Sequence, residues 1–222
     1  MPTKLEGNKL QNPQPKETPN NTVKPNCHIA GVLLNIITPN ASAEVAADNK
    51  IAFKTNKGVS YHADSLKLIQ SKRFLNKYEG KVDLIFTSPP FSLVKKKAYG
   101  NENGEEYIQW LAEFAKPLTR LLTDTGSIVV ELGNAWEQGH PVFSTVPLEA
   151  LLRFKSEANL HLCQEIICHN PSRIPSPAQW VTIERIRLKD SFTRLWWLSK
   201  TENPKADNKK VLHEYSHSMR SL

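Results

Sequence analysis

Five consecutive residues carry groups that could do chemistry: Thr87, Ser88, Pro89, Pro90 and Phe91. They follow the apolar run 82–86, which predicts a buried strand. Each proline fixes its own φ angle and has no N–H to donate, and the residue before each proline is held extended. We therefore expect the chain to leave the sheet as a stiff hook that presents carbonyl groups, one hydroxyl and one aromatic face.

These groups suit the exocyclic amine of a nucleobase. The Ser88 hydroxyl and the carbonyls of Ser88 and Pro89 can accept hydrogen bonds from its two protons. Such an amine is a poor nucleophile, because its lone pair is conjugated with the ring, so acceptors that orient it favour attack on a methyl group. Phe91 can stack on a base flipped out of the duplex. The alternative is a proline-rich turn without a catalytic role.

Alternating helices and strands surround the hook. This order predicts an open α/β sheet, part of it parallel. Trp196 and Trp197 are expected in the core rather than as a stacking platform. The pattern predicts a hairpin over 51–62, a helix from Asp64 onward, a long amphipathic helix over 107–122, a strand over 127–132, a helix over 146–154, and strands over 161–169 and 193–198.

Length and composition limit the class of protein. The chain has 222 residues, enough for one domain with a core. Its net charge of +7 is a weak indication of an anionic partner. No apolar run approaches the ~20 residues of a membrane span, and no signal-peptide pattern is present, so we expect a cytoplasmic protein. Residues 1–26 predict a disordered tail, 27–50 stay unassigned, and 51–222 form the catalytic part.

The hook resembles motif IV of the amino-group DNA methyltransferases, (Ser/Asn/Asp)-Pro-Pro-aromatic, whose Ser form is commonest in the cytosine-N4 enzymes. Segments 87–101, 169–181 and 186–212 resemble the beta-class, PvuII-type modification enzymes more specifically, and the resemblance covers roughly 55–222. It implies part of a Rossmann-like α/β sheet with helices on both faces. It also implies transfer of a methyl group from S-adenosylmethionine to cytosine N4 of double-stranded DNA, in a restriction-modification system.

The resemblance also suggests roles for residues outside the motif. Residues 61–66 resemble the family segment that faces the cofactor's adenine, which implies a cofactor contact at Asp64, with a second at Thr87. Ala63 stands where the family usually has glycine, and a plain helix N-cap is the alternative for Asp64. Two basic groups are predicted to contact DNA: Lys95, Lys96 and Lys97, and Arg173, Arg185 and Arg187. For the lysines, a solvated loop is the alternative.

The three cysteines argue against other chemistries. Cys27, Cys163 and Cys168 show no paired-ligand spacing, so we predict neither a metal site nor a disulfide framework. Cytosine-C5 methyltransferases need a nucleophilic cysteine, typically after proline, and neither Cys163 nor Cys168 has that setting. Both are expected to be buried apolar strand residues.

One family feature is missing. The family binds the methionine part of its cofactor with a glycine-rich loop, yet no two of the nine glycines are separated by a single residue. Gly133 ends a strand in Gly-Asn-Ala-Trp, a poor substitute. We therefore expect the N-terminal catalytic half of an enzyme that is truncated or split, with the loop and the target-recognition region on a second polypeptide. The alternatives are adenine-N6 methylation and a non-catalytic DNA-binding remnant.

Overall fold

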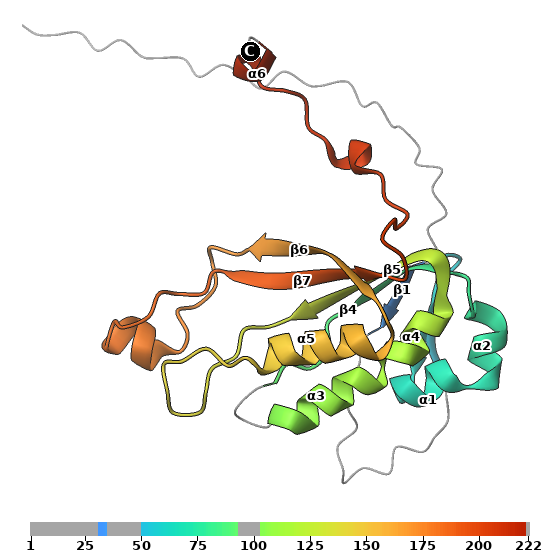
Figure 1. Cartoon of the computed structure of the whole chain (residues 1–222), viewed down its shortest axis with the longest axis horizontal. Helices are drawn as coiled ribbons and strands as arrows, with labels where there is room; N and C mark the ends of the chain where they lie inside the picture. Colours follow the sequence, from blue (N-terminus) through green and yellow to red (C-terminus); the bar gives the residue numbers. More distant parts are fainter. Residues whose placement is uncertain (1–30, 35–49, 93–102, 221–222) are drawn as a thin grey trace, which may run out of the picture.

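A five-stranded mixed sheet forms the centre of the computed structural model, which describes residues 31–34, 50–92 and 103–220 (Figure 1). β1, β4 and β5 are parallel, and β7 runs antiparallel to both β5 and β6. The predicted α/β sheet with a parallel part is confirmed. In spatial order the strands are β1 (Gly31–Leu34), β4 (Val82–Thr87), β5 (Leu122–Leu132), β7 (Phe192–Ser199) and β6 (His161–His169).

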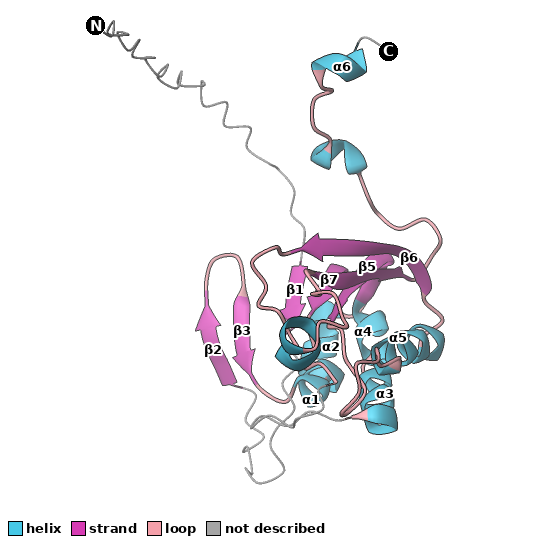
Figure 2. Ribbon diagram, turned by 90° about the vertical axis from the view of Figure 1, so that its left-hand side faces the viewer, coloured by secondary structure: helices cyan, strands magenta, loops and turns pink. Residues whose placement is uncertain are grey.

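The described helices cover one face of this sheet and bury its core, whereas the sequence resemblance implied helices on both faces (Figures 1 and 2). The largest fully buried side chains include Tyr107, Phe154, Ile85 and Ile128. No described helix is long and apolar enough to cross a membrane. The helices are α1 (Ser65–Gln70), α2 (Lys72–Tyr78), α3 (Gly104–Glu113), α4 (Ala115–Leu121), α5 (Val146–Glu157) and α6 (His217–Arg220), with a π-helix at Gln179–Ile183 and a 3-10 helix at Asn208–Val211.

The predicted hairpin is present as a separate two-stranded sheet of β2 (Lys50–Lys54) and β3 (Val59–His62). The helix predicted over 107–122 is instead divided into α3 and α4 at Phe114. Pro117 accounts for the division, because it cannot donate to the carbonyl of residue 113 and its ring crowds that carbonyl.

β5 begins five residues earlier than predicted, at Leu122 instead of Ser127. Val82 pairs with Leu122 and Leu84 with Ser127, so the extra residues bulge out of the ladder. Gly126 allows this close approach, since a Cβ there would lie 2.9 Å from the carbonyl oxygen of Val82.

The two faces of the sheet differ in burial. Ile85, Ile128 and Leu198 lie opposite one another across three strands and are completely buried under the helices. The row on the other face, Phe86, Val129 and Trp197, is only half-buried and lies outside the core cluster. Of the two tryptophans predicted in the core, Trp196 packs against it, whereas the Nε1–H of Trp197 donates to Ser127 Oγ at 2.8 Å on the open face.

The prediction that Cys163 and Cys168 are buried is wrong. Cys163 is half-buried and Cys168 is exposed. Both lie on β6, which is the edge strand of the sheet and pairs only with β7. An apolar strand at an edge, with one neighbour and no helix over it, exposes side chains that a central strand would bury.

Asp64 is the N-cap of α1, and this leaves its predicted contact with a cofactor untested. Its Oδ1 accepts a hydrogen bond from the backbone N–H of Lys67 at 3.0 Å. We expect Asp64→Ala to lower the free energy of unfolding by about 0.5–2 kcal/mol, because the cap is lost, and Asp64→Asn to retain most of it. Urea unfolding would measure this. An equal loss in both variants would show that charge, rather than capping, is what matters.

A second prediction concerns pH. Hydrogen bonds from Lys205 Nζ (2.9 Å) and Thr123 Oγ1 (3.0 Å) hold the pKa of Asp83 below its ordinary 3.8. A carboxyl whose pKa falls on folding stabilises the protein above its unfolded pKa, and this contribution disappears as pH falls through the folded pKa. Asp83→Asn should therefore be less stable than wild type at pH 7, and the difference should shrink as the pH falls below 3.8. Urea unfolding between pH 7 and 3 would test this, with Asp124→Asn, at an exposed position, as control. A difference independent of pH would contradict it.

Candidate functional site

The hook leaves the sheet at the carboxyl ends of the parallel strands. Thr87, the last residue of β4, pairs with Val130 of β5 and with Leu34 of β1, and its side chain is buried. Residues 88–92 then run without regular structure. Ser88, Pro90 and Phe91 are half-buried, whereas Pro89 is buried. In open α/β sheets this edge is where ligands bind, so the chain places the predicted catalytic groups at the edge expected of a site.

Phe91 lies against the residue that follows β5. A Cβ added to Gly133 would stand 2.5, 2.8 and 2.9 Å from ring carbons Cδ2, Cε2 and Cγ of Phe91. Carbon atoms in contact are normally about 3.5–4.0 Å apart. The ring therefore occupies space that any residue other than glycine would fill. In the sequence Gly133 is only a poor substitute for a cofactor loop, and nothing in the residue pattern points to this contact.

Polar contacts hold the chain next to Gly133. Asn134 is buried; its amide donates to Asp190 Oδ2 and its Oδ1 accepts from Arg194 Nη1, each at 3.1 Å. Arg194 also pairs with Glu165 at 3.0 Å. The guanidinium group lies 5.3 Å from the ring centre of Phe192 and 5.6 Å from that of Phe143. The end of β5 is thus fixed to β6 and β7.

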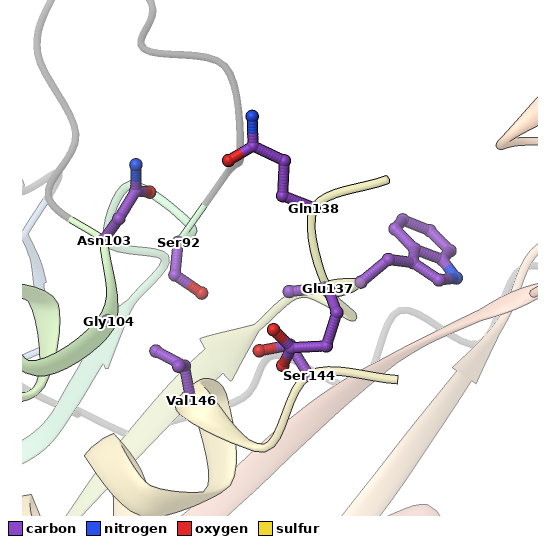
Figure 3. Close-up of a pocket in the computed structure, with 9 residues that line it drawn as sticks. Ser92, Asn103, Gly104, Glu137, Gln138, Ser144 and Val146 are labelled. Atoms are coloured by element: carbon purple, nitrogen blue, oxygen red, sulfur yellow. The ribbon is translucent and has the colours of Figure 1, made fainter. Parts of the chain in front are cut away.

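A pocket of about 170 Å³ adjoins the hook (Figure 3). Neither Ser88 nor Phe91 lines it. Figure 3 shows Ser92 between the start of α3, at Asn103 and Gly104, and the segment that carries Glu137. Two buried donors, Ser92 Oγ and Trp136 Nε1, have no hydrogen-bond partner among the described residues. The other lining residues are Asn103, Gly104, Ala135, Glu137, Gln138, Ser144 and Val146.

The pocket was not predicted from the sequence, because its walls come from three separate segments. Unsatisfied buried donors are unusual in folded proteins and call for an explanation. Ser92 is therefore available to hydrogen-bond a group that enters the pocket.

The side chain of Asp64, one of the two predicted cofactor residues, is held by contacts at the start of its own helix. The Asp64 side chain bonds within α1, with a second oxygen 3.9 Å from Lys67 Nζ, and makes no hydrogen bond or ion pair to the hook. No three metal-binding side chains come together in the part of the chain that the structure describes.

The three arginines predicted to contact DNA lie on the segment between β6 and β7. Arg173 Nη1 donates to the carbonyl of Phe192 at 2.7 Å, and Arg187 Nη1 to that of Pro141 at 2.8 Å. The Arg187 guanidinium also lies 5.6 Å from the ring centre of Trp136 in the pocket wall. Arg185 is exposed. The other predicted DNA contacts, Lys95, Lys96 and Lys97, lie outside the described residues.

The chain is 39% identical over 189 residues to the Type II methyltransferase M.PvuII of Proteus hauseri, an alignment that covers 85% of this chain and 55% of the relative. The solved PvuII DNA methyltransferase (cytosine-N4-specific) superposes with a TM-score of 0.65 at 41% identity, covering 74% of this chain and 57% of that one. The chain thus spans about half the length of these relatives.

A solved complex of M1.HpyAVI with SAM matches more distantly, with a TM-score of 0.45 and 20% identity over 70% of this chain and 60% of that one. The model of the N6_N4_Mtase family, described as DNA methylase, matches residues 82–221. That segment includes the hook, Gly133, the Arg194 contacts and all three DNA-binding arginine candidates. By this match over more than half of its length, the chain belongs to the DNA methylase family.

Proposed function

We propose that this chain is the catalytic part of a site-specific DNA methyltransferase that transfers a methyl group from S-adenosylmethionine to cytosine N4. The observation that carries the proposal is the Ser-Pro-Pro-Phe hook at the carboxyl ends of β4 and β5. Its Ser form and the 41% identity to a cytosine-N4-specific enzyme favour cytosine over adenine. A restriction-modification role follows from the Type II relative.

Ser88 and the hook carbonyls orient the amine. The two protons of cytosine N4 donate to Ser88 Oγ and to the carbonyl oxygens of Ser88 and Pro89, which directs the nitrogen lone pair away from the hook. S-adenosylmethionine supplies an electrophilic methyl group to that lone pair. The sulfonium sulfur of the cofactor would be the leaving group. The methylated amine, which then carries a positive charge, would lose one proton to water, while its hydrogen bonds to these oxygens keep it in place. Phe91 stacks on the ring and holds it at the reacting distance.

The residues present fit only part of the cofactor. Asp64 and Thr87 are the candidates to contact it from the β3 and β4 ends. The strand that pairs with the outer side of β4 is β1, and the 15 residues that follow it, 35–49, contain no glycine. The sequence after that strand therefore offers no glycine for close backbone approach to the methionine part.

A further polypeptide segment is needed to complete the site. We infer that it corresponds to the part of the relatives that this chain does not span, whether it is continuous with the chain or separate. The open face of the sheet supports this. Leu84, Phe86, Val129, Leu195 and Trp197 are half-buried there and lie outside the core cluster. An apolar sheet face of this kind is normally covered by a second layer.

Two other functions are distinguishable. Adenine-N6 methylation keeps the same hook and is compatible with the family, whose model name includes both amines. A non-catalytic DNA-binding remnant is favoured by the absence of a glycine loop. Double-stranded DNA is the partner in all three cases.

Binding and product analysis test the proposal. One hydrogen bond to a carboxylate is worth about 1.5–3 kcal/mol, whereas micromolar affinity needs about 8 kcal/mol. Residues 1–222 alone should therefore bind S-adenosylmethionine more weakly than micromolar in calorimetry and transfer no methyl group. Adding a polypeptide with the glycine loop and recognition region should restore both.

Mass spectrometry of the digested DNA should then find N4-methylcytosine. N6-methyladenine would favour the first alternative, and no methylated base in the complemented enzyme would favour the second. Robust methylation by residues 1–222 alone would show that the cofactor site has been misassigned.

Ser88→Ala should lower turnover of the complemented enzyme by about 10²- to 10⁴-fold, the usual cost of losing a proton acceptor. Affinities for DNA and cofactor should change little, because the hook backbone is retained. Ser60→Ala, at an exposed position on β3, is the matched control. Equal turnover in both variants would remove Ser88 from the mechanism.

A further inference from the structure

We propose that Gly133 is a positioning residue for the base-stacking ring of Phe91. This inference rests on the proposed function, because it assigns Phe91 to the target base. The two residues follow different strands, β4 and β5, and their contact is close. A Cβ at Gly133 would lie 2.5–2.9 Å from three carbons of the ring. Gly133 therefore determines how closely the Phe91 ring can approach the backbone at the end of β5.

The backbone at Gly133 has little room to move away. Its neighbour Asn134 is buried and bonded on both sides of its amide, to Asp190 and to Arg194. Arg194 is in turn paired with Glu165 on β6. On the other side, Leu132 is buried and pairs with Arg194 in the sheet. A side chain at position 133 would consequently displace the Phe91 ring rather than the strand.

The geometry also assigns the side of the ring that a base can use. Gly133 closes one side, whereas Phe91 as a whole is only half-buried. A flipped base therefore stacks on the side away from β5. An alanine at position 133 must push the ring by roughly 1 Å to reach an ordinary carbon–carbon contact. That displacement moves the ring into the space of the base.

Fluorine NMR can detect the displacement without any activity. The full chain would be labelled with 4-fluorophenylalanine at its eight phenylalanines, and the Phe91 signal assigned from its loss in Phe91→Leu. We expect Gly133→Ala to shift the Phe91 signal. Two matched glycine variants serve as controls. Gly126→Ala clashes with the Val82 carbonyl at the other end of β5, and Gly58→Ala meets no atom closer than 4.0 Å. Both should leave the Phe91 signal in place.

A double-mutant cycle in the complemented enzyme tests the role in base capture. Loss of base stacking corresponds to about 5- to 150-fold in kcat/KM, and we expect a loss in this range for Gly133→Ala and for Phe91→Ala. Because Gly133 acts through the ring, Gly133→Ala added to Phe91→Ala should cost almost nothing more. Gly126→Ala should lower the melting temperature without this coupling to Phe91.

The outcomes separate the two proposals. An unmoved Phe91 signal in Gly133→Ala, or losses that multiply in the double variant, would overturn the positioning role while leaving the methyltransferase intact. A complemented wild-type enzyme that methylates no DNA would overturn the proposed function and the base-stacking role with it. In that case a shifted signal would still establish the packing of Phe91 on Gly133.

Discussion

The parallel pairing of β4 with β5 determines where every group of the site lies. Thr87 is opposite Val130 in this ladder, so the hook that follows β4 meets the residues that follow β5. A slip of one residue would bring Leu132 or Asn134 to the place that Gly133 occupies beside Phe91. Either side chain would fill the space of the ring. The slip would also turn every side chain of the strand to the other face of the sheet.

Burial enforces this register. Ile85, Ile128 and Leu198 form one row across β4, β5 and β7, and each is completely buried under the helices. Shifting any of these strands by one residue would expose an aliphatic side chain of this row, at a cost of about 1.5–3 kcal/mol each. The bulge before Ser127 takes up the length mismatch at the far end, where Gly126 permits close backbone approach. The catalytic geometry is therefore a consequence of core packing.

Local sequence signals predicted where the helices and strands form better than they predicted how those elements pair and how deeply they are buried. The hairpin over 51–62 and the strand over 161–169 were predicted from alternation and turn residues, and the hook from its two prolines. Burial of Cys163 and Cys168 was predicted wrongly, because it depends on the position of β6 at the sheet edge, which the strand's own residues do not specify. The early start of β5 depends likewise on pairing with Val82. Pro117, by contrast, was a visible signal for the division at Phe114. The role of Gly133 is not visible in the sequence, since it arises from the short distance between its backbone, after β5, and the ring of Phe91, after β4.

The described residues form a fully packed core, but some of their apolar and polar groups outside it are uncovered or unpaired. The side chains that set the β4–β5 register are completely buried, so the hook and Gly133 can be held in place without another polypeptide. Other groups of the described residues remain uncovered or unpaired. They include the apolar row of Phe86, Val129 and Trp197 on the open face, and the buried donors Ser92 Oγ and Trp136 Nε1. Each such donor left unpaired costs about 1–3 kcal/mol. A binding partner or ligand that satisfies them gains affinity without having to build the catalytic geometry, which the sheet already provides.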